Sequence, residues 1–176
     1  NTSNILFFSG GPTLNGSLRN IDVKRSGKIV SNFDFYDLLI NGNTNNDVRL
    51  QSNDAIVINP IGKKVSISGE IKNQATYELL DGENFLDLIK FSSGFTNLSD
   101  KGRITLGTIA ENGERFFSNY NLEEISSINL KDGDEIFVHK LSNTPRNIVK
   151  INGAIATPGS VAFEQGLTLE DVIKKE

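Results

Sequence analysis

The sequence predicts an α+β fold built from tandem copies of one unit, each a mixed β-sheet with one main helix. The first observation is a 26-residue stretch, 65–90, that returns at 149–174 with eight identical positions. Unrelated sequences of this composition would share about one or two. Within the stretch, strand-like alternation gives way to helical spacing, and turn signals of hairpins follow it. One helix packed across a sheet is the usual solution for such an order.

The repeated stretch opens with a predicted hairpin and closes with a helix. Val65, Ile67 and Gly69 alternate with polar residues, as a half-buried strand requires, and a second short strand is expected at 76–79. Apolar residues then recur at helical spacing from Phe85, and Gly94 is the expected C-cap. In the second copy, Pro158-Gly159 forms the turn, and Thr168 caps the helix with Asp171 three residues later.

Strands joined by tight turns complete each unit. Asn112-Gly113 predicts a hairpin of strands 103–109 and 114–117, and Ser26-Gly27 predicts one of 21–24 and 28–30. A short helical turn is expected at 34–39. Residues 47–58 match 127–138, which predicts closing strands at 55–58 and 135–138. Each unit is therefore β-grasp-like.

The repeat divides the chain into three parts. Residues 1–64 are the back part of one unit, 65–148 are a complete unit, and 149–176 are the front hairpin and helix of another. Asn1 is expected to lie within a truncated helix. Both partial units would expose sheet edges, so we predict that 149–176 completes 1–64, within one chain or by exchange between chains.

Composition indicates a soluble globular protein and argues against several functions. The 176 residues are 37% hydrophobic and 23% charged, with a net charge of -4 and a pI near 5.1. A nucleic-acid partner is not expected because the basic residues are scattered and outnumbered. The lack of cysteine excludes disulfides, iron–sulfur clusters and thiolate zinc sites. No run approaches the ~20 apolar residues of a membrane helix. Because the chain starts at Asn1 and lacks methionine, we interpret it as a fragment whose targeting segment or anchor lies outside it.

No catalytic, cofactor or metal site is predicted. The single histidine, His139, is expected in a solvated loop after the closing strand, without a triad partner. Three acids around the helix start would complement its dipole better than they would form a glycosidase pair. The stretch 132–135 is expected to be a turn, because it lacks the rest of a calcium-loop pattern. Gly10-Gly11 lacks the lysine of a phosphate loop. The three acids are Asp81, Glu83 and Asp87.

Aromatic residues leave one ligand question open. Phe35, Tyr36 and Tyr120 could line a sugar surface, but at least two of them are expected to pack in the core. The ligand-binding residues are therefore unknown from sequence.

The motifs resemble a known family. The pattern V-x-I-x-G-x-I, then P-G-x-V, then G-x-T-L-x-D-V-I of the later copy is similar to the soluble-ligand-binding β-grasp (SLBB) domain of bacterial polysaccharide export proteins. Residues 10–63, with D-F-Y-D-L-L at their centre, resemble the section of such exporters between two successive β-grasp domains. Gln74-Ala75 and Ser93-Gly94 depart from the usual Pro-Gly and Gly-Gly, both at turns.

The resemblance implies a non-catalytic conduit. Such exporters are lipoproteins of the Gram-negative outer membrane whose periplasmic domains form homo-oligomeric rings. A capsular or extracellular polysaccharide passes through the ring from an inner-membrane copolymerase. The alternative is a periplasmic β-grasp module that binds a discrete small ligand or saccharide, and an enzyme is the third and least favoured reading.

Overall fold

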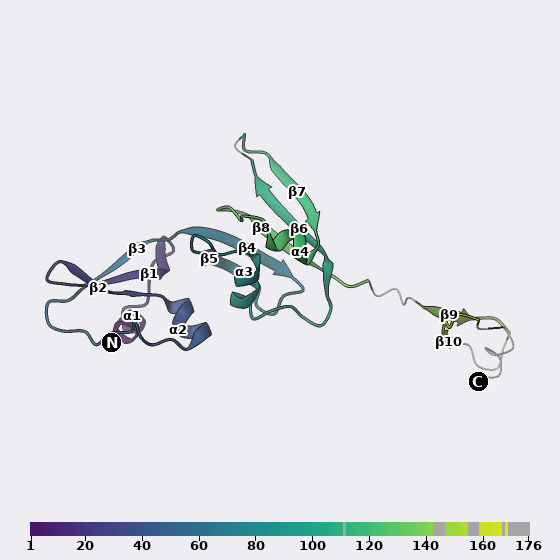
Figure 1. Cartoon of the computed structure of the whole chain (residues 1–176), viewed down its shortest axis with the longest axis horizontal. Helices are drawn as coiled ribbons and strands as arrows, with labels where there is room; N and C mark the ends of the chain where they lie inside the picture. Colours follow the sequence, from purple (N-terminus) through teal and green to yellow (C-terminus); the bar gives the residue numbers. More distant parts are fainter. Residues whose placement is uncertain (111, 143–146, 155–158, 167, 169–176) are drawn as a thin grey trace. The chain divides into compact units, whose positions relative to one another are not determined.

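The computed structural model describes residues 1–110, 112–142, 147–154, 159–166 and 168, and it divides into two compact units, 1–141 and 142–176 (Figure 1). Its strands and short helices form mixed and antiparallel sheets, which confirms the α+β prediction. The predicted helix after Thr168 and the turn at Pro158 lie outside the described residues.

The first part of unit 1 is a three-stranded sheet with two helices. In chain order these elements are α1 (Thr2–Phe8), β1 (Gly16–Arg25), β2 (Lys28–Phe33), α2 (Phe35–Asn41) and β3 (Ala55–Pro60). The strand order is β2-β1-β3, so β3 is an edge strand. Ser26 and Gly27 both adopt positive φ in the β1–β2 turn, as predicted for a tight hairpin.

A five-stranded sheet with two helices completes unit 1. Its elements are β4 (Lys63–Gly69), β5 (Ala75–Leu79), α3 (Phe85–Phe91), β6 (Ser99–Ile109), β7 (Arg115–Tyr120), α4 (Leu122–Ser126) and β8 (Glu135–Lys140). The strand order is β5-β4-β8-β6-β7, with β4 and β8 parallel and the other pairs antiparallel. The sequence did not predict α4, whose five residues are held by a capping box between Asn121 and Glu124.

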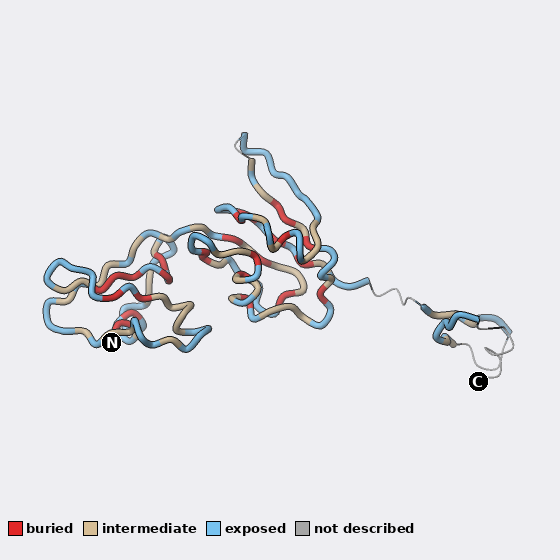
Figure 2. Tube along the Cα trace, viewed as in Figure 1, coloured by how far each residue is buried: buried red, intermediate tan, exposed pale blue. Residues whose placement is uncertain are grey.

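Each sheet buries its own core. In the larger sheet, strand residues Val65, Ile67, Ile104 and Val138 pack under Phe85 and Leu88 of α3, and all are at most 1% exposed. The smaller sheet buries Leu6, Ile21 and Phe33. Figure 2 shows the buried positions along the inner strands of both sheets. The predicted alternation of the strands therefore points their apolar residues to the helix side.

The two sheets use the same register, which extends the repeat from sequence to structure. In the β1–β3 pair, Ile21 lies opposite Ile58 and Val23 opposite Ile56. In the β6–β8 pair, Ile104 lies opposite Val138 and Leu106 opposite Ile136. The smaller sheet thus corresponds to β7-β6-β8 and contains no counterpart of the β4–β5 hairpin within the described residues of unit 1.

Asn1, expected within the first helix, lies at the N-cap position directly before it. The helix α1 spans seven residues, as α3 does, and Asn1 occupies the N-cap position that Asn84 holds before α3. Both helices are short because a turn closes them early. In α3 this is the left-handed pair Ser93 and Gly94.

Unit 2 is described as a single hairpin, β9 (Ile148–Ile151) with β10 (Gly159–Ala162). Val149 pairs with Val161 and Ile151 with Gly159. Val65 pairs with Tyr77 and Ile67 with Ala75 in the β4–β5 hairpin, so the two hairpins share one register.

Gly69 marks a close approach between β4 and β8. Its φ is +89°, and a Cβ placed there would lie 2.2 Å from the carbonyl oxygen of Val138. Gly82 has nearly the same φ, +88°, but no atom of the described chain lies within 4 Å of its Cβ position. The two glycines therefore separate the cost of backbone conformation from the cost of crowding.

We expect Gly82→Ala to lower the free energy of unfolding by about 1–2 kcal/mol, the cost of a left-handed alanine. Gly69→Ala carries the same cost and a further ~1–3 kcal/mol, because β8 must move away from β4. Urea unfolding followed by circular dichroism measures both. Equal losses in the two variants would contradict a close approach at Gly69.

Candidate functional site

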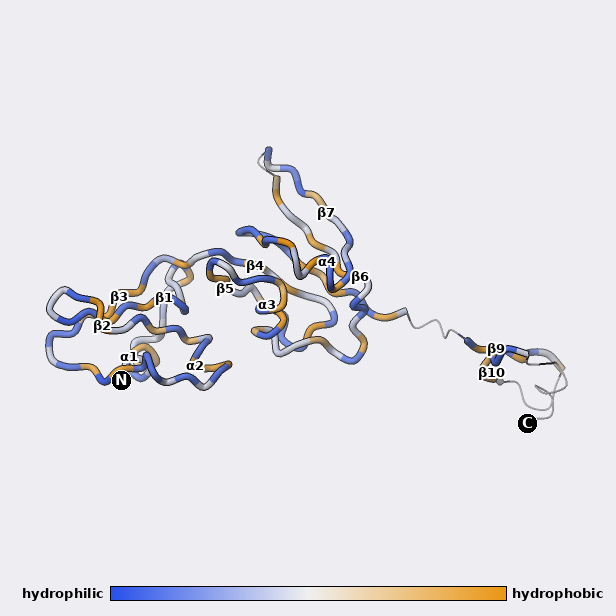
Figure 3. Tube along the Cα trace, viewed as in Figure 1, coloured by the Kyte–Doolittle hydropathy of each residue, from blue (hydrophilic) through white to orange (hydrophobic). Residues whose placement is uncertain are grey.

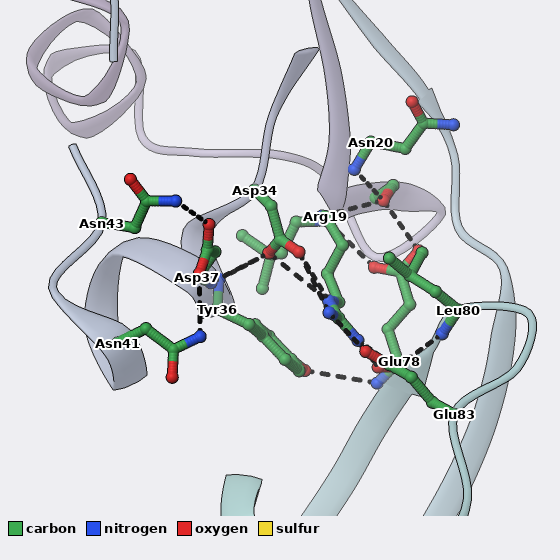
Figure 4. Close-up of polar contacts among 12 residues, drawn as sticks. Arg19, Asn20, Asp34, Tyr36, Asp37, Asn41, Asn43, Glu78, Leu80 and Glu83 are labelled. Carbon is green, nitrogen blue, oxygen red and sulfur yellow. Dashed lines mark hydrogen bonds and ion pairs between the residues drawn. The ribbon is translucent and has the colours of Figure 1, made fainter. Parts of the chain in front are cut away.

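A buried arginine connects the two sheets of unit 1. Arg19 lies on the inward side of β1, in step with Ile21 and Val23, and is only 5% exposed. Its Nη2 donates to Asp34 Oδ2 at 3.0 Å and to Glu83 Oε1 at 2.8 Å. Its Nη1 contacts Glu83 Oε2 and donates to the Glu78 backbone oxygen at 3.2 Å. The guanidinium therefore bridges a carboxylate of each sheet region (Figure 4).

Two aromatic rings complete the surroundings of this guanidinium. The Cζ of Arg19 lies 4.7 Å from the ring centroid of Tyr36 and 4.8 Å from that of Phe91. A planar guanidinium stacks on rings while it forms in-plane ion pairs, which an ammonium group cannot do. Burial lowers the pKa of Arg19, but the hydrogen bonds to Glu83 and Asp34 outweigh it and raise this pKa overall. Arg19 is therefore always charged.

Glu78 forms a second buried link between the sheets. Its carboxylate accepts hydrogen bonds from Ser17 Oγ at 2.7 Å, Leu18 N at 3.1 Å and Gly62 N at 2.9 Å, and the residue is 4% exposed. Its backbone N–H donates to the Tyr36 hydroxyl at 3.2 Å. Hydrogen bonds to a carboxylate are stronger than those between neutral groups. Glu78 therefore fixes the start of β1 and the β3–β4 connection against β5.

A polar cleft of about 370 Å³ opens beside Arg19. Residues of α2, of α3 and of the end of β5 contribute to its lining. The lining contains four carboxylates, three amides, two cations and two aromatic rings. Its lining residues are Arg19, Asn32, Asp34, Tyr36, Asp37, Asn41, Asn46, Leu80, Glu83, Asp87, Lys90 and Phe91.

The cleft is a preorganised polar surface. Asp37 accepts hydrogen bonds from Asn41 Nδ2 at 2.8 Å and Asn43 Nδ2 at 2.6 Å, and these bonds lower the pKa of Asp37. Lys90 Nζ donates to Asn41 Oδ1 at 2.7 Å. Amides and carboxylates beside aromatic rings offer both hydrogen bonds and an apolar face. This chemistry suits a neutral or cationic polyhydroxylated ligand.

The predicted site residues lie in different places. Glu83 forms an ion pair with Arg19, and Asp87 accepts a hydrogen bond from the backbone N–H of Asn84 in the capping box of α3. Asp81 lies in the turn before α3. The three acids therefore form no facing pair for hydrolysis. Of the aromatic residues, Tyr36 lines the cleft, whereas Phe35 and Tyr120 pack against the two cores. In the stretch 132–135, Asp132 and Gly133 form a turn, with Gly133 at φ +84°, and Glu135 already begins β8.

The expected position of His139 is wrong. It lies within β8, half-buried, and its Nε2 is 2.7 Å from the hydroxyl of Thr105 on β6. The strand extends two residues further than predicted because Ser99 of β6 pairs with Lys140. No group of three or more potential metal ligands occurs among the described residues.

The comparison with protein families decides the domain type. Residues 64–116 and 148–175 match the SLBB domain. The chain contains two segments that match the SLBB domain. This confirms the predicted resemblance in both copies of the repeat. SLBB domains occur in polysaccharide export proteins, where they are periplasmic binding and transport modules.

Two further findings concern relatives and membrane-spanning helices. No curated protein matches the sequence. Among the described residues, no helix has the length and apolar character needed to span a membrane.

Sequence reasoning missed the role of Arg19, although a signal was present. The alternation that points Ile21 and Val23 inward also points Ser17 and Arg19 inward. A charged residue at such a position needs a charged partner. The acid of the D-F-Y-D-L-L stretch, Asp34, is that partner, and Tyr36 of the same stretch is the ring that stacks on Arg19.

We expect Arg19→Ala to lower the free energy of unfolding by about 3 kcal/mol, because it leaves two partly buried carboxylates without a cation. Arg19→Lys should recover only part of this loss, since lysine cannot pair with both acids and stack. Urea unfolding measures both.

Arg115→Ala is the matched control. Its exposed pair with Glu135 should contribute at most about 0.5 kcal/mol. A loss for Arg19→Ala no larger than that for Arg115→Ala would contradict the structural role of the buried cluster.

Proposed function

We propose that this chain is a structural and conduit module of an outer-membrane polysaccharide exporter. In this role it forms part of the periplasmic ring through which a capsular or extracellular polysaccharide passes. The observation that carries the proposal is the pair of SLBB matches along one chain, at 64–116 and 148–175. Successive SLBB domains build a wall rather than a single binding site, and the Arg19 cluster supplies the fixed junction that a wall needs.

The proposed partners follow from this role. They are the polysaccharide in transit, further copies of the protein in a homo-oligomeric ring, and an inner-membrane copolymerase that delivers the polymer. The outer membrane is contacted through regions of a lipoprotein beyond this chain. A net charge of -4 does not favour contact with nucleic acid, and the exporter role needs no enzymatic activity, cofactor or metal.

Genetic replacement tests the exporter role. In the bacterium that carries the gene, we expect deletion of the segment encoding 65–141 to abolish surface polysaccharide and to retain polymer inside the envelope. Restoring the gene with Arg115→Ala should restore export, because that residue lies in an exposed ion pair. Unchanged surface polysaccharide after the deletion would contradict the proposal.

A second candidate function is the binding of a discrete saccharide, and the cleft beside Arg19 favours it. The cleft volume of about 370 Å³ lies within the range of small-molecule sites. Its exposed amide, Asn41, lies between the acid of α2 and the cation of α3.

Titration with short neutral and amino-sugar oligosaccharides, followed by NMR, tests this second candidate. We expect shifts at Tyr36 and Lys90, and about a tenfold weaker affinity for Asn41→Ala, since losing a hydrogen bond that the bound saccharide would bury costs about 1–2 kcal/mol. Asn119→Ala, on β7 outside the cleft, is the control. Binding that is equally weak in both variants, or shifts elsewhere, would rule out the cleft.

A further inference from the structure

One edge of β3 has no partner strand among the described residues. In the larger sheet, β8 holds β6 on one side and β4 on the other. Its counterpart β3 pairs with β1 on one side and, among the described residues, has no strand on the other. A strand edge with unpaired backbone groups is a template for another strand.

Burial at matching positions shows what the smaller sheet lacks. Val138 of β8 is 0% exposed, whereas Ile58, at the same place on β3, is 37% exposed. The β4–β8 contact accounts for the difference, because β4 covers that edge of β8 and Gly69 lies directly beside Val138. An apolar residue at the position of Ile58 is thus left half-covered only where the hairpin is missing.

The β9–β10 hairpin has the complementary deficit. Its apolar strand residues Val149, Ile151 and Val161 are only half-buried. Figure 3 shows hydrophobic segments along β9 and β10. Val65 and Ile67, which match the first two, are 0% and 1% exposed against α3 and β8. An isolated two-stranded hairpin is marginal in water, so a partner surface would stabilise this one.

Gly153 points to the geometry of that partner. It matches Gly69 in the repeat and likewise has positive φ, +130°. At Gly69 a Cβ would collide with the backbone of Val138, but at Gly153 no described atom lies within 4 Å of the Cβ position. The repeat therefore keeps a glycine whose crowding appears only when a β8-like strand lies beside it.

We propose that the β9–β10 hairpin of one copy adds to the β3 edge of a second copy, with β9 parallel to β3. The β4–β8 register, transferred through the repeat, places Lys150 beside Ala55, Ile151 beside Ile56, Asn152 beside Val57 and Gly153 beside Ile58. Because α1 already supplies the main helix of the smaller sheet, the hairpin is the part that it still requires.

Chain length favours a second copy over pairing within one chain. The strand β8 runs parallel to β4 and pairs Val138 with Gly69, so Lys140 at its end lies beyond the end of β4. Ala55 lies at the opposite end, because it begins β3, which continues into β4 after two residues (Figure 1). The 14 steps from Ala55 to Gly69 span about 45 Å at the rise of a strand. In the proposed register Lys150 lies beside Ala55, so within one chain the segment from Lys140 to Lys150 would have to cover that distance. Its ten residues reach at most about 35 Å, which is too short.

The contact is heterologous, because each copy offers one hairpin and one edge. Such contacts produce a ring when the rotation between copies closes and an open filament when it does not. The inference concerns assembly alone and holds whether or not the assembly conducts a polysaccharide.

Single-cysteine variants of the 176-residue chain test the proposed register, since the chain has no cysteine of its own. Val57→Cys and Asn152→Cys are prepared separately, mixed and oxidised, so that only a contact between copies can join them. Val30→Cys on β2, the other edge of the same sheet, mixed with Asn152→Cys, is the control.

We expect about ten times more disulfide-linked dimer from the first mixture than from the control, because a disulfide requires closely placed Cα atoms. Sedimentation velocity of the unmodified chain should show association that increases with concentration. Equal cross-linking in the two mixtures, association without the specific cross-link, or a chain that stays monomeric at every concentration would each overturn the proposal.

Discussion

The buried guanidinium of Arg19 is the constraint on which the arrangement of unit 1 depends. It lies on the smaller sheet, pairs with Asp34 at the start of α2, and reaches Glu83 before α3 of the larger sheet. Tyr36 and Phe91, one from each region, hold it by stacking. A buried ion pair is weak support for stability as such, since removing both charges can be neutral. Its effect here is geometric: the network is satisfied only when the two sheets adopt one orientation.

That constraint links the fold to the proposed role. A conduit wall made of repeated domains needs junctions that transmit a fixed angle, and the carboxylates of Asp34, Glu83 and Glu78 are all committed to this junction. The same junction borders the polar cleft, because Arg19, Asp34, Tyr36, Glu83 and Phe91 of the junction also line it. Structure and candidate ligand site therefore share one set of residues. Any saccharide bound in the cleft would contact residues of the junction between the two sheets.

Sequence reasoning predicted the local structure well and the contacts between residues far apart in the chain poorly. Alternation and turn residues located the β4–β5 hairpin, the Asn112-Gly113 turn and the helix from Phe85, because these depend on neighbours in the chain. The lengths of β1 and β8 were underestimated, since pairing partners extended both strands beyond their apolar cores. The role of Arg19 depends on acids 15 and 64 residues away, and no local pattern encodes that distance. His139 was misplaced for the same reason, as its partner Thr105 lies on another strand.

The central claim is that Arg19 holds the two sheets of unit 1 as one rigid body. Residual dipolar couplings of backbone N–H groups in β1–β3 and in β4–β8 test it most directly. The account predicts that both sets fit a single alignment tensor in the unmodified chain and need two different tensors in the variant Arg19→Ala. Two different tensors in the unmodified chain would contradict it.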